Sequence, residues 1–113
     1  MVGGEWPLAS PEHAVIVTYQ LSGDGFGETY ERDVVHALTA RLSVAIESAE
    51  AGELDGGEFG GGEVTLYAFG SNASRLFSTM EPYLRAFPAR PAHAVLRFGE
   101  AGDVAAAEQR VEL

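Results

Sequence analysis

The sequence predicts an α+β fold in which a four-stranded antiparallel sheet carries two helices on one face. Residues 13–21 and 63–69 are apolar at both odd and even positions, which is typical of strands in the interior of a sheet. Residues 29–50 and 76–87 repeat apolar side chains at spacings of three and four, which is the pattern of amphipathic helices. The predicted order of elements is strand, helix, strand, strand, helix, strand.

The first helix follows a strand at residues 13–21 and a glycine-containing connection. Acidic residues in or beside its first turn favour the positive end of the helix dipole, and Gly52 is well placed to end it. Its apolar stripe consists of Val34, Val35, Leu38, Leu42, Ile46 and Ala49.

A hairpin is predicted next. Residues 53–59 indicate a weak strand, which we expect at an edge because glycines destabilise a strand interior. The glycines at 60–62 predict a turn, and residues 63–69 predict a strong strand inside the sheet.

The second helix is expected to begin at a cap formed by Asn72 or Ser71. Pro82 lies inside the helical pattern and is expected to kink the helix or to split it after Glu81. Residues 93–99 predict the last strand, and Asp103 is placed to cap a short alanine-rich C-terminal helix.

This βαββαβ order favours a ferredoxin-like sandwich when the crossovers are right-handed. In that fold the first and third strands lie in the middle of a four-stranded antiparallel sheet, and the second and fourth lie at its edges. The two doubly apolar segments are the first and third strands, which agrees with this arrangement. The two helices cover one face, and the short C-terminal helix is an addition.

The length of 113 residues predicts one domain. We expect an N-terminal arm at residues 1–12, the folded domain at 13–99 and a tail, helical in part, at 100–113. The absence of cysteine excludes disulfides and thiolate metal sites. The first residues lack the pattern of a signal peptide, and no segment holds the roughly 20 apolar residues of a membrane span, so a cytoplasmic protein is expected.

The charge balance is strongly acidic, with 17 acidic residues, 7 arginines and a formal net charge of −10. Such a charge repels nucleic acids and anionic lipids, so neither is expected as a partner. Arginine without lysine, together with much alanine and glycine, is typical of a GC-rich bacterial genome.

The stretch LSGDGFGETYERD, residues 21–33, lies between a strand and a helix, as phosphate-binding loops do. Its glycines do not follow the G-x-G-x-x-G spacing, however, and the chain has no lysine for a Walker motif. Four acidic residues surround the place of a phosphate, and only Arg32 opposes them. We therefore expect no nucleotide here and no cofactor elsewhere.

No catalytic or metal-binding set is indicated. The three histidines fall on separate predicted elements, and no serine has a base placed by spacing. An enzyme is therefore the less favoured interpretation.

The bare face of the predicted sheet is the leading candidate for function. If alternate residues face the helices, then Tyr67, Phe69 and Arg97 point outward beside Ile16 and Val95. An RNA-binding sheet is disfavoured, because acidic and apolar residues stand where a basic residue and glycine are required. An exposed apolar sheet face more often marks self-association or another protein contact.

A second hypothesis concerns the hairpin, where Asp55 and Glu58, with Arg32, are candidates for a small-molecule or weak catalytic site. Residues 52–82 resemble a group of small bacterial domains with a D-G-x-E-x-G hairpin motif, an aromatic-bearing strand and a capped helix. The matching positions are Gly52, Asp55, Gly56, Glu58, Gly60, Tyr67, Gly70, Leu76, Phe77 and Pro82. Phe69 departs from the tyrosine of that pattern, and Ser71 and Asn72 depart from its proline–aspartate pair. The resemblance implies a ferredoxin-like fold and no particular activity.

From the sequence we therefore expect a non-enzymatic domain that binds itself, as a homodimer, or another protein through its open sheet face. The alternative is a carboxylate site at the glycine-rich hairpin.

Overall fold

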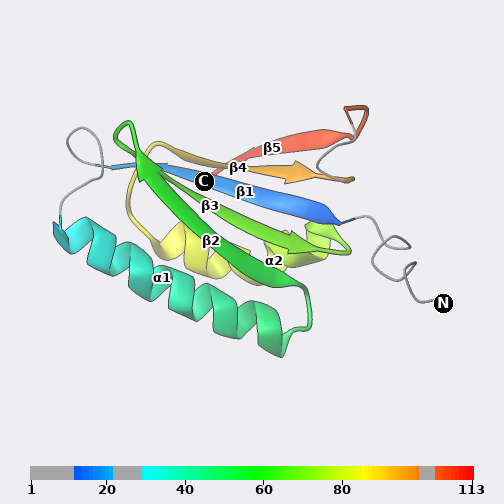
Figure 1. The fold of residues 1–113 in the computed structure, drawn as a ribbon, viewed down its shortest axis with the longest axis horizontal. Coiled ribbons are helices and arrows are strands. Elements are labelled where there is room, and N and C mark those ends of the chain that lie inside the picture. Colours follow the sequence, from blue (N-terminus) through cyan, green and yellow to red (C-terminus); the bar gives the residue numbers. More distant parts are fainter. Residues whose placement is uncertain (1–11, 22–28, 100–103) are drawn as a thin grey trace.

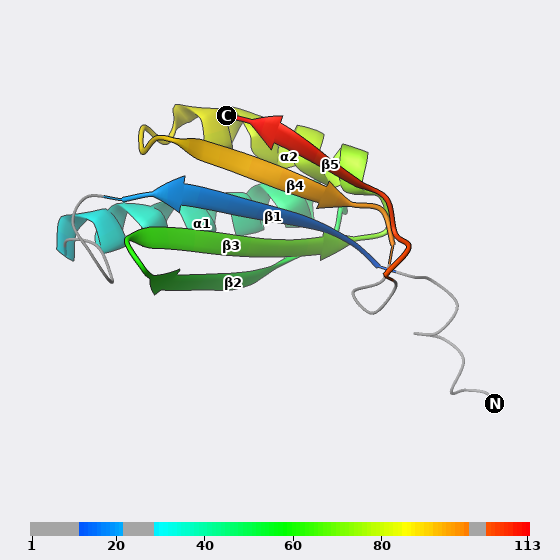
Figure 2. The same cartoon turned by 90° about the horizontal axis from the view of Figure 1, so that it is seen from above.

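The computed structural model describes residues 12–21, 29–99 and 104–113, and these form one five-stranded antiparallel sheet with both helices on one face (Figures 1 and 2). The strand order is β2-β3-β1-β4-β5. The elements are β1 (His13–Gln20), α1 (Thr29–Ser48), β2 (Glu53–Gly60), β3 (Glu63–Gly70), α2 (Ala73–Ala86), β4 (Ala92–Arg97) and β5 (Glu108–Glu112).

The prediction of a four-stranded ferredoxin-like sandwich with a C-terminal helix is wrong. The sheet has a fifth strand, β5, which pairs antiparallel with β4 and takes the edge position expected for β4. The interior positions of β1 and β3 are confirmed. Residues 1–11 of the arm expected at 1–12, the glycine loop at 22–28 and the cap at Asp103 lie outside the described residues.

The C-terminal segment forms a strand because β4 offers it an open edge. Val111 pairs with Ala94, and Val111 and Leu113 pack partly buried against the core. An isolated helix of this length is marginal in water. Strand pairing provides a ladder of backbone hydrogen bonds and apolar burial, so tertiary context overrides the helix propensity of the alanines.

The core lies between the sheet and the two helices. Strand residues on the inner face, including Val15, Val17 and Leu66, are fully buried. The stripes of α1 and α2 pack onto them, except that Val34, which was expected in the α1 stripe, is 44% exposed. The predicted inward and outward alternation of β1 and β3 is confirmed. The helical residues in this core are Val35, Leu38, Leu42, Ile46, Ala73, Leu76, Phe77, Met80 and Leu84.

The β2–β3 hairpin closes through Gly61 and Gly62, with φ of 62° and 79°. Two successive residues with positive φ are what a two-residue type I′ turn requires, and glycine adopts such angles without strain. In α2, Asn72 is the N-cap and its side chain accepts a hydrogen bond from the Arg75 amide. The expected split after Glu81 is wrong, because α2 continues through Pro82 to Ala86.

Arginine side chains donate hydrogen bonds to carbonyl groups at the C-terminal ends of both helices. The Arg75 guanidinium donates to the carbonyl oxygens of Ala49 and Glu50, just beyond α1. At the end of α2, Arg90 donates to the carbonyls of Arg85 and Phe87. These carbonyls have no partner within a helix, so the guanidinium groups replace water there.

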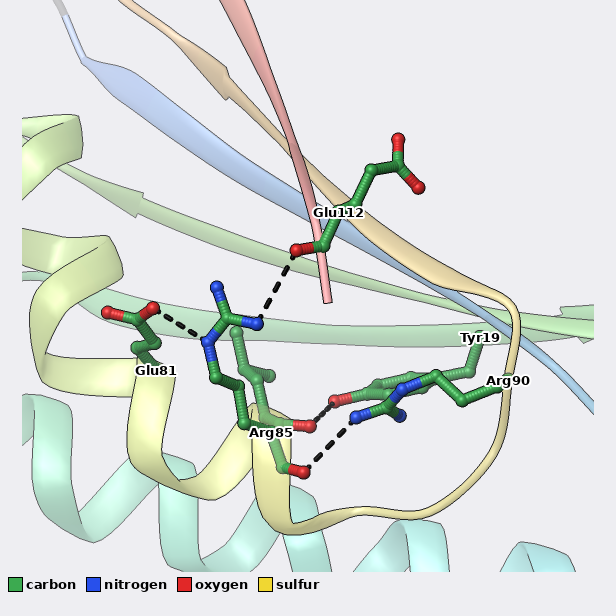
Figure 3. A network of polar contacts seen from close by, with 6 residues as sticks. Tyr19, Glu81, Arg85, Arg90 and Glu112 are labelled. Carbon is green, nitrogen blue, oxygen red and sulfur yellow. Dashed lines mark hydrogen bonds and ion pairs between the residues drawn. The ribbon is translucent and has the colours of Figure 1, made fainter.

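Tyr19 binds a carbonyl group in the last turn of α2 from within the core, as Figure 3 shows. Its hydroxyl donates to the Leu84 carbonyl at 2.7 Å, and its ring packs edge-to-face on Phe87. In the same network, Arg85 joins Glu81 to the backbone of β5 through the Glu112 carbonyl. The hydroxyl of a fully buried residue on the central strand thus helps to fix the position of α2.

Replacing Tyr19 by Phe is expected to lower the free energy of unfolding by about 1–3 kcal/mol, because the Leu84 carbonyl loses its buried donor while the ring remains. Urea denaturation measures this change. The matched control is Tyr83→Phe at a position 37% exposed, for which a change within about 0.5 kcal/mol is expected. Equal effects of the two substitutions would contradict the assignment.

Alkaline pH is expected to destabilise the fold through the same residue. Burial raises the pKa of Tyr19 above its ordinary value of 10, and the nearby Arg90 charge only partly opposes this. The folded state therefore keeps a proton that the unfolded state loses, so stability falls as pH rises above 10, by about 1.4 kcal/mol per pH unit. Urea unfolding at several alkaline pH values should show a shallower decline for Tyr19→Phe than for the wild type. An identical decline would contradict this origin.

Candidate functional site

The face of the sheet that is turned away from the helices carries rows of side chains in register. Ile16 on β1 pairs with Tyr67 on β3 and with Val95 on β4, so three apolar side chains form one row across three strands. We call this row the central row; its side chains are half-buried. The row on one side of it consists of Phe69, Ala14 and Arg97. The row on the other side consists of Thr65, Thr18 and His93.

The outer strands put charged side chains at the rims of this face. On β2, Glu53 lies opposite Phe69 and Glu58 lies opposite Thr65. On β5, Arg110 lies opposite Val95. The open face is therefore apolar at its centre and charged at both rims.

The β5 rim is neutralised by ion pairs, whereas the β2 rim is acidic. Arg97 pairs with Glu108 at 2.9 Å and Arg110 pairs with Glu112 at 2.5 Å. The bond from Arg110, followed by the Arg110 charge, lowers the pKa of the exposed Glu112 carboxyl. The side chain of Arg97 is only 16% exposed, so its stem covers part of the sheet while its head is paired.

Tyr67, Phe69 and Arg97 therefore share one face, as the sequence predicts. In the part of the chain that the structure describes, no helix or strand covers this face (Figure 2).

The three residues of the alternative site do not come together. Asp55 lies in a bulge, where the β2–β3 register shifts between Leu54 and Gly56, and its side chain is exposed. Glu58 is exposed on the open face. Arg32 is exposed on α1, which packs on the opposite face, so Arg32 and Glu58 share no pocket.

Glu58 instead accepts a hydrogen bond of 2.8 Å from the Tyr67 hydroxyl. Tyr67 lies opposite Gly56, which has no side chain, so its ring can extend toward the diagonal neighbour Glu58. The bond, followed by slight burial and the negative charge of Glu58, raises the pKa of Tyr67. A raised pKa keeps the hydroxyl neutral and is opposite to what an activated nucleophile or base requires.

The histidines have structural contacts. The Nδ1 atom of His13 accepts a hydrogen bond from the Ala73 amide at 3.1 Å, so it caps the first turn of α2. The ring of His36 packs edge-to-face on Phe59 and covers the edge strand. Among residues 12–21, 29–99 and 104–113, no three metal-ligating side chains come together, and no described helix is long and apolar enough to cross a membrane.

Sequence reasoning missed two features of the site region. The arginine caps were not predicted, because a guanidinium that reaches a distant carbonyl leaves no local signal. The outer surface of the helix layer was also missed, although Val34, Val44 and Tyr83 are exposed there. For α1 a signal existed, since valines and alanines occur on both sides of its core stripe.

Comparisons of the chain with protein-family models, curated proteins and solved structures returned no match. The resemblance of residues 52–82 to small bacterial domains stays a prediction. The geometry of the open face is therefore the main indication of what this chain does.

Glu58→Gln is expected to lower the pKa of Tyr67 toward its ordinary value, because an amide lacks the charge that holds the phenolic proton. Ultraviolet titration of the wild type and the variant, with Tyr67→Phe to identify the signal, measures this shift. Glu53→Gln, on the same strand and rim, is the matched control and should leave the titration unchanged. A shift of equal size in that control would contradict the bond.

Proposed function

We propose that this chain is a non-enzymatic protein-binding domain whose contact surface is the open sheet face, occupied by another protein or by a second copy of the chain. The observation that carries the proposal is the central row of Ile16, Tyr67 and Val95, aligned across three neighbouring strands. Antiparallel sheets with one solvated face normally alternate apolar inward and polar outward residues. An apolar row on the bare side departs from that pattern and suits a covered surface.

The chemistry of the face supports a protein partner over a small molecule. The face extends over several neighbouring strands of an open sheet, which offers the broad contact area that protein interfaces use. An apolar centre with a charged rim is the usual anatomy of a protein interface.

The rims also indicate the kind of partner. Glu53 and Glu58 make the β2 side acidic, and the chain as a whole carries a net charge of −10. The pairs on the β5 side are internally neutralised. A partner with an apolar centre and basic side chains facing β2 would complement this face.

Site-specific photo-crosslinking in cells tests the proposal. A benzophenone amino acid at Val95 is expected to give one discrete adduct that mass spectrometry identifies as a protein, whereas the same probe at the exposed Ser78 on α2 should not give that adduct. Adding Ile16→Lys should abolish the adduct, because a charge in the central row cannot be buried unpaired. Ser78→Lys, combined with the probe at Val95, is the matched charge control and should preserve it.

Circular dichroism establishes that each variant is folded. The absence of any adduct at Val95, or an adduct that persists unchanged in Ile16→Lys, would overturn the proposal.

A further inference from the structure

The outer surface of the helix layer exposes large apolar side chains. Val34 is 44%, Val44 is 65% and Tyr83 is 37% exposed, and among the described residues only Val104 is a further large apolar side chain of this kind. Val34 and Val44 lie on α1, and Tyr83 lies on α2. This surface faces away from the sheet and is separate from the proposed contact face (Figure 1).

These side chains flank grooves that run between the two helices. One groove has a volume of about 600 Å³ and an adjoining one about 820 Å³, and Arg41, Pro82 and Tyr83 line both. Their α1 side extends from Asp33 to Ser48, which corresponds to roughly 22 Å of helix at 1.5 Å per residue. Asp33 and Arg41 are the only charged residues in the lining of these two grooves.

On this side α1 carries a second stripe, distinct from the stripe that enters the core. It consists of Val34, Ala37, Arg41 and Val44, spaced by three, four and three residues, which is the spacing of a helix–helix seam. A helix with apolar residues on two sides is normally covered on both.

The stripe is complementary to itself when two copies of α1 pack antiparallel. A two-fold axis near Thr39 places Val34 opposite Val44 of the second copy, and Arg41 opposite Ala37 of the second copy. Both pairs have the same midpoint, so a single axis satisfies them. The small Ala37 leaves room for the long Arg41 side chain.

The same axis also matches the charges. Asp33 lies one turn from Ala37, so Arg41 of one copy comes within reach of Asp33 of the other. Within the part of the chain that the structure describes, neither residue has a partner. We propose that two copies of this chain associate through an isologous interface between their helix layers, held by the apolar stripe and by two Arg41–Asp33 pairs.

This interface leaves the open sheet face of each copy uncovered. It is therefore independent of the proposed function, and it holds or fails separately from it. A net charge of −10 on each copy opposes association, so screening by salt should tighten the dimer even though the two ion pairs weaken slightly.

Sedimentation equilibrium of the whole chain, with charge exchange at the interface, tests the proposal. The wild type should dimerise, and Arg41→Asp or Asp33→Arg alone should weaken the dimer at least about tenfold, because each places like charges together. The double variant Asp33→Arg/Arg41→Asp restores opposite charges and should return the dissociation constant to within about threefold of the wild type. Arg32→Asp changes an exposed arginine of α1 outside the stripe and is the matched control for net charge.

Two further variants separate this interface from the sheet face. Val44→Glu should abolish dimerisation, whereas Ile16→Lys on the open sheet face should leave it intact. A monomeric wild type, a dimer that Val44→Glu does not change, or a double variant as weak as the singles would overturn the proposal. A dimer lost in Ile16→Lys but kept in Val44→Glu would assign self-association to the sheet face instead.

Discussion

The pairing of β1 on both of its edges is the constraint on which the rest of the structure depends. β1 is hydrogen-bonded to β3 on one side and to β4 on the other, and both pairings are antiparallel. The side chains of a strand alternate between two faces, so a slip of one residue would turn Val15 and Val17 out of the core and Ile16 into it. The buried valines thereby fix which residues form the central row. The same alternation that builds the core defines the candidate binding surface.

The arginines differ in what they do: some stabilise the fold, whereas Arg41 lies at the surface without an acidic partner among the residues that the structure describes. Several of the arginines hold the fold together: Arg75 and Arg90 complete helix ends, and Arg85 joins α2 to β5. A guanidinium presents five donors in a planar fork and can satisfy two carbonyls at once, which a lysine does less well. Arg41, in contrast, has no acidic partner within the described residues and lines a groove. In so acidic a chain, the unpaired guanidinium of Arg41 is therefore the feature of the helix surface that most strongly indicates a binding partner.

The parts of the fold that were predictable from sequence are those with a local signal. The doubly apolar β1 and β3, the stripe of α1 and the Asn72 cap each depend on residues close in sequence, and they were located correctly apart from Val34, which was assigned to the α1 stripe but is exposed. β5 was mistaken for a helix, because its stability comes from the distant edge of β4 and three alanines, at 105–107, directly precede it.

The residues of the candidate sites were likewise predictable only where a local pattern placed them. Tyr67, Phe69 and Arg97 were placed on one face by alternation alone, whereas Asp55 and Glu58 were grouped by their closeness in sequence. Asp55 lies in the bulge between Leu54 and Gly56, and the hydrogen bond that the Tyr67 hydroxyl donates to Glu58 depends on cross-strand register that the sequence does not contain.

The two candidate surfaces differ in shape, and this difference bears on how they would work together. The sheet face extends over several neighbouring strands, whereas the helix layer is grooved and has large exposed apolar side chains. They lie on opposite sides of a thin molecule with extents of 50 × 30 × 22 Å, so occupation of one leaves the other free. Association through the helix layer would turn two sheet faces outward in opposite directions. Such a dimer is bivalent, and a partner that presents two copies of the same surface would be held more tightly than by either face alone, without any new contact.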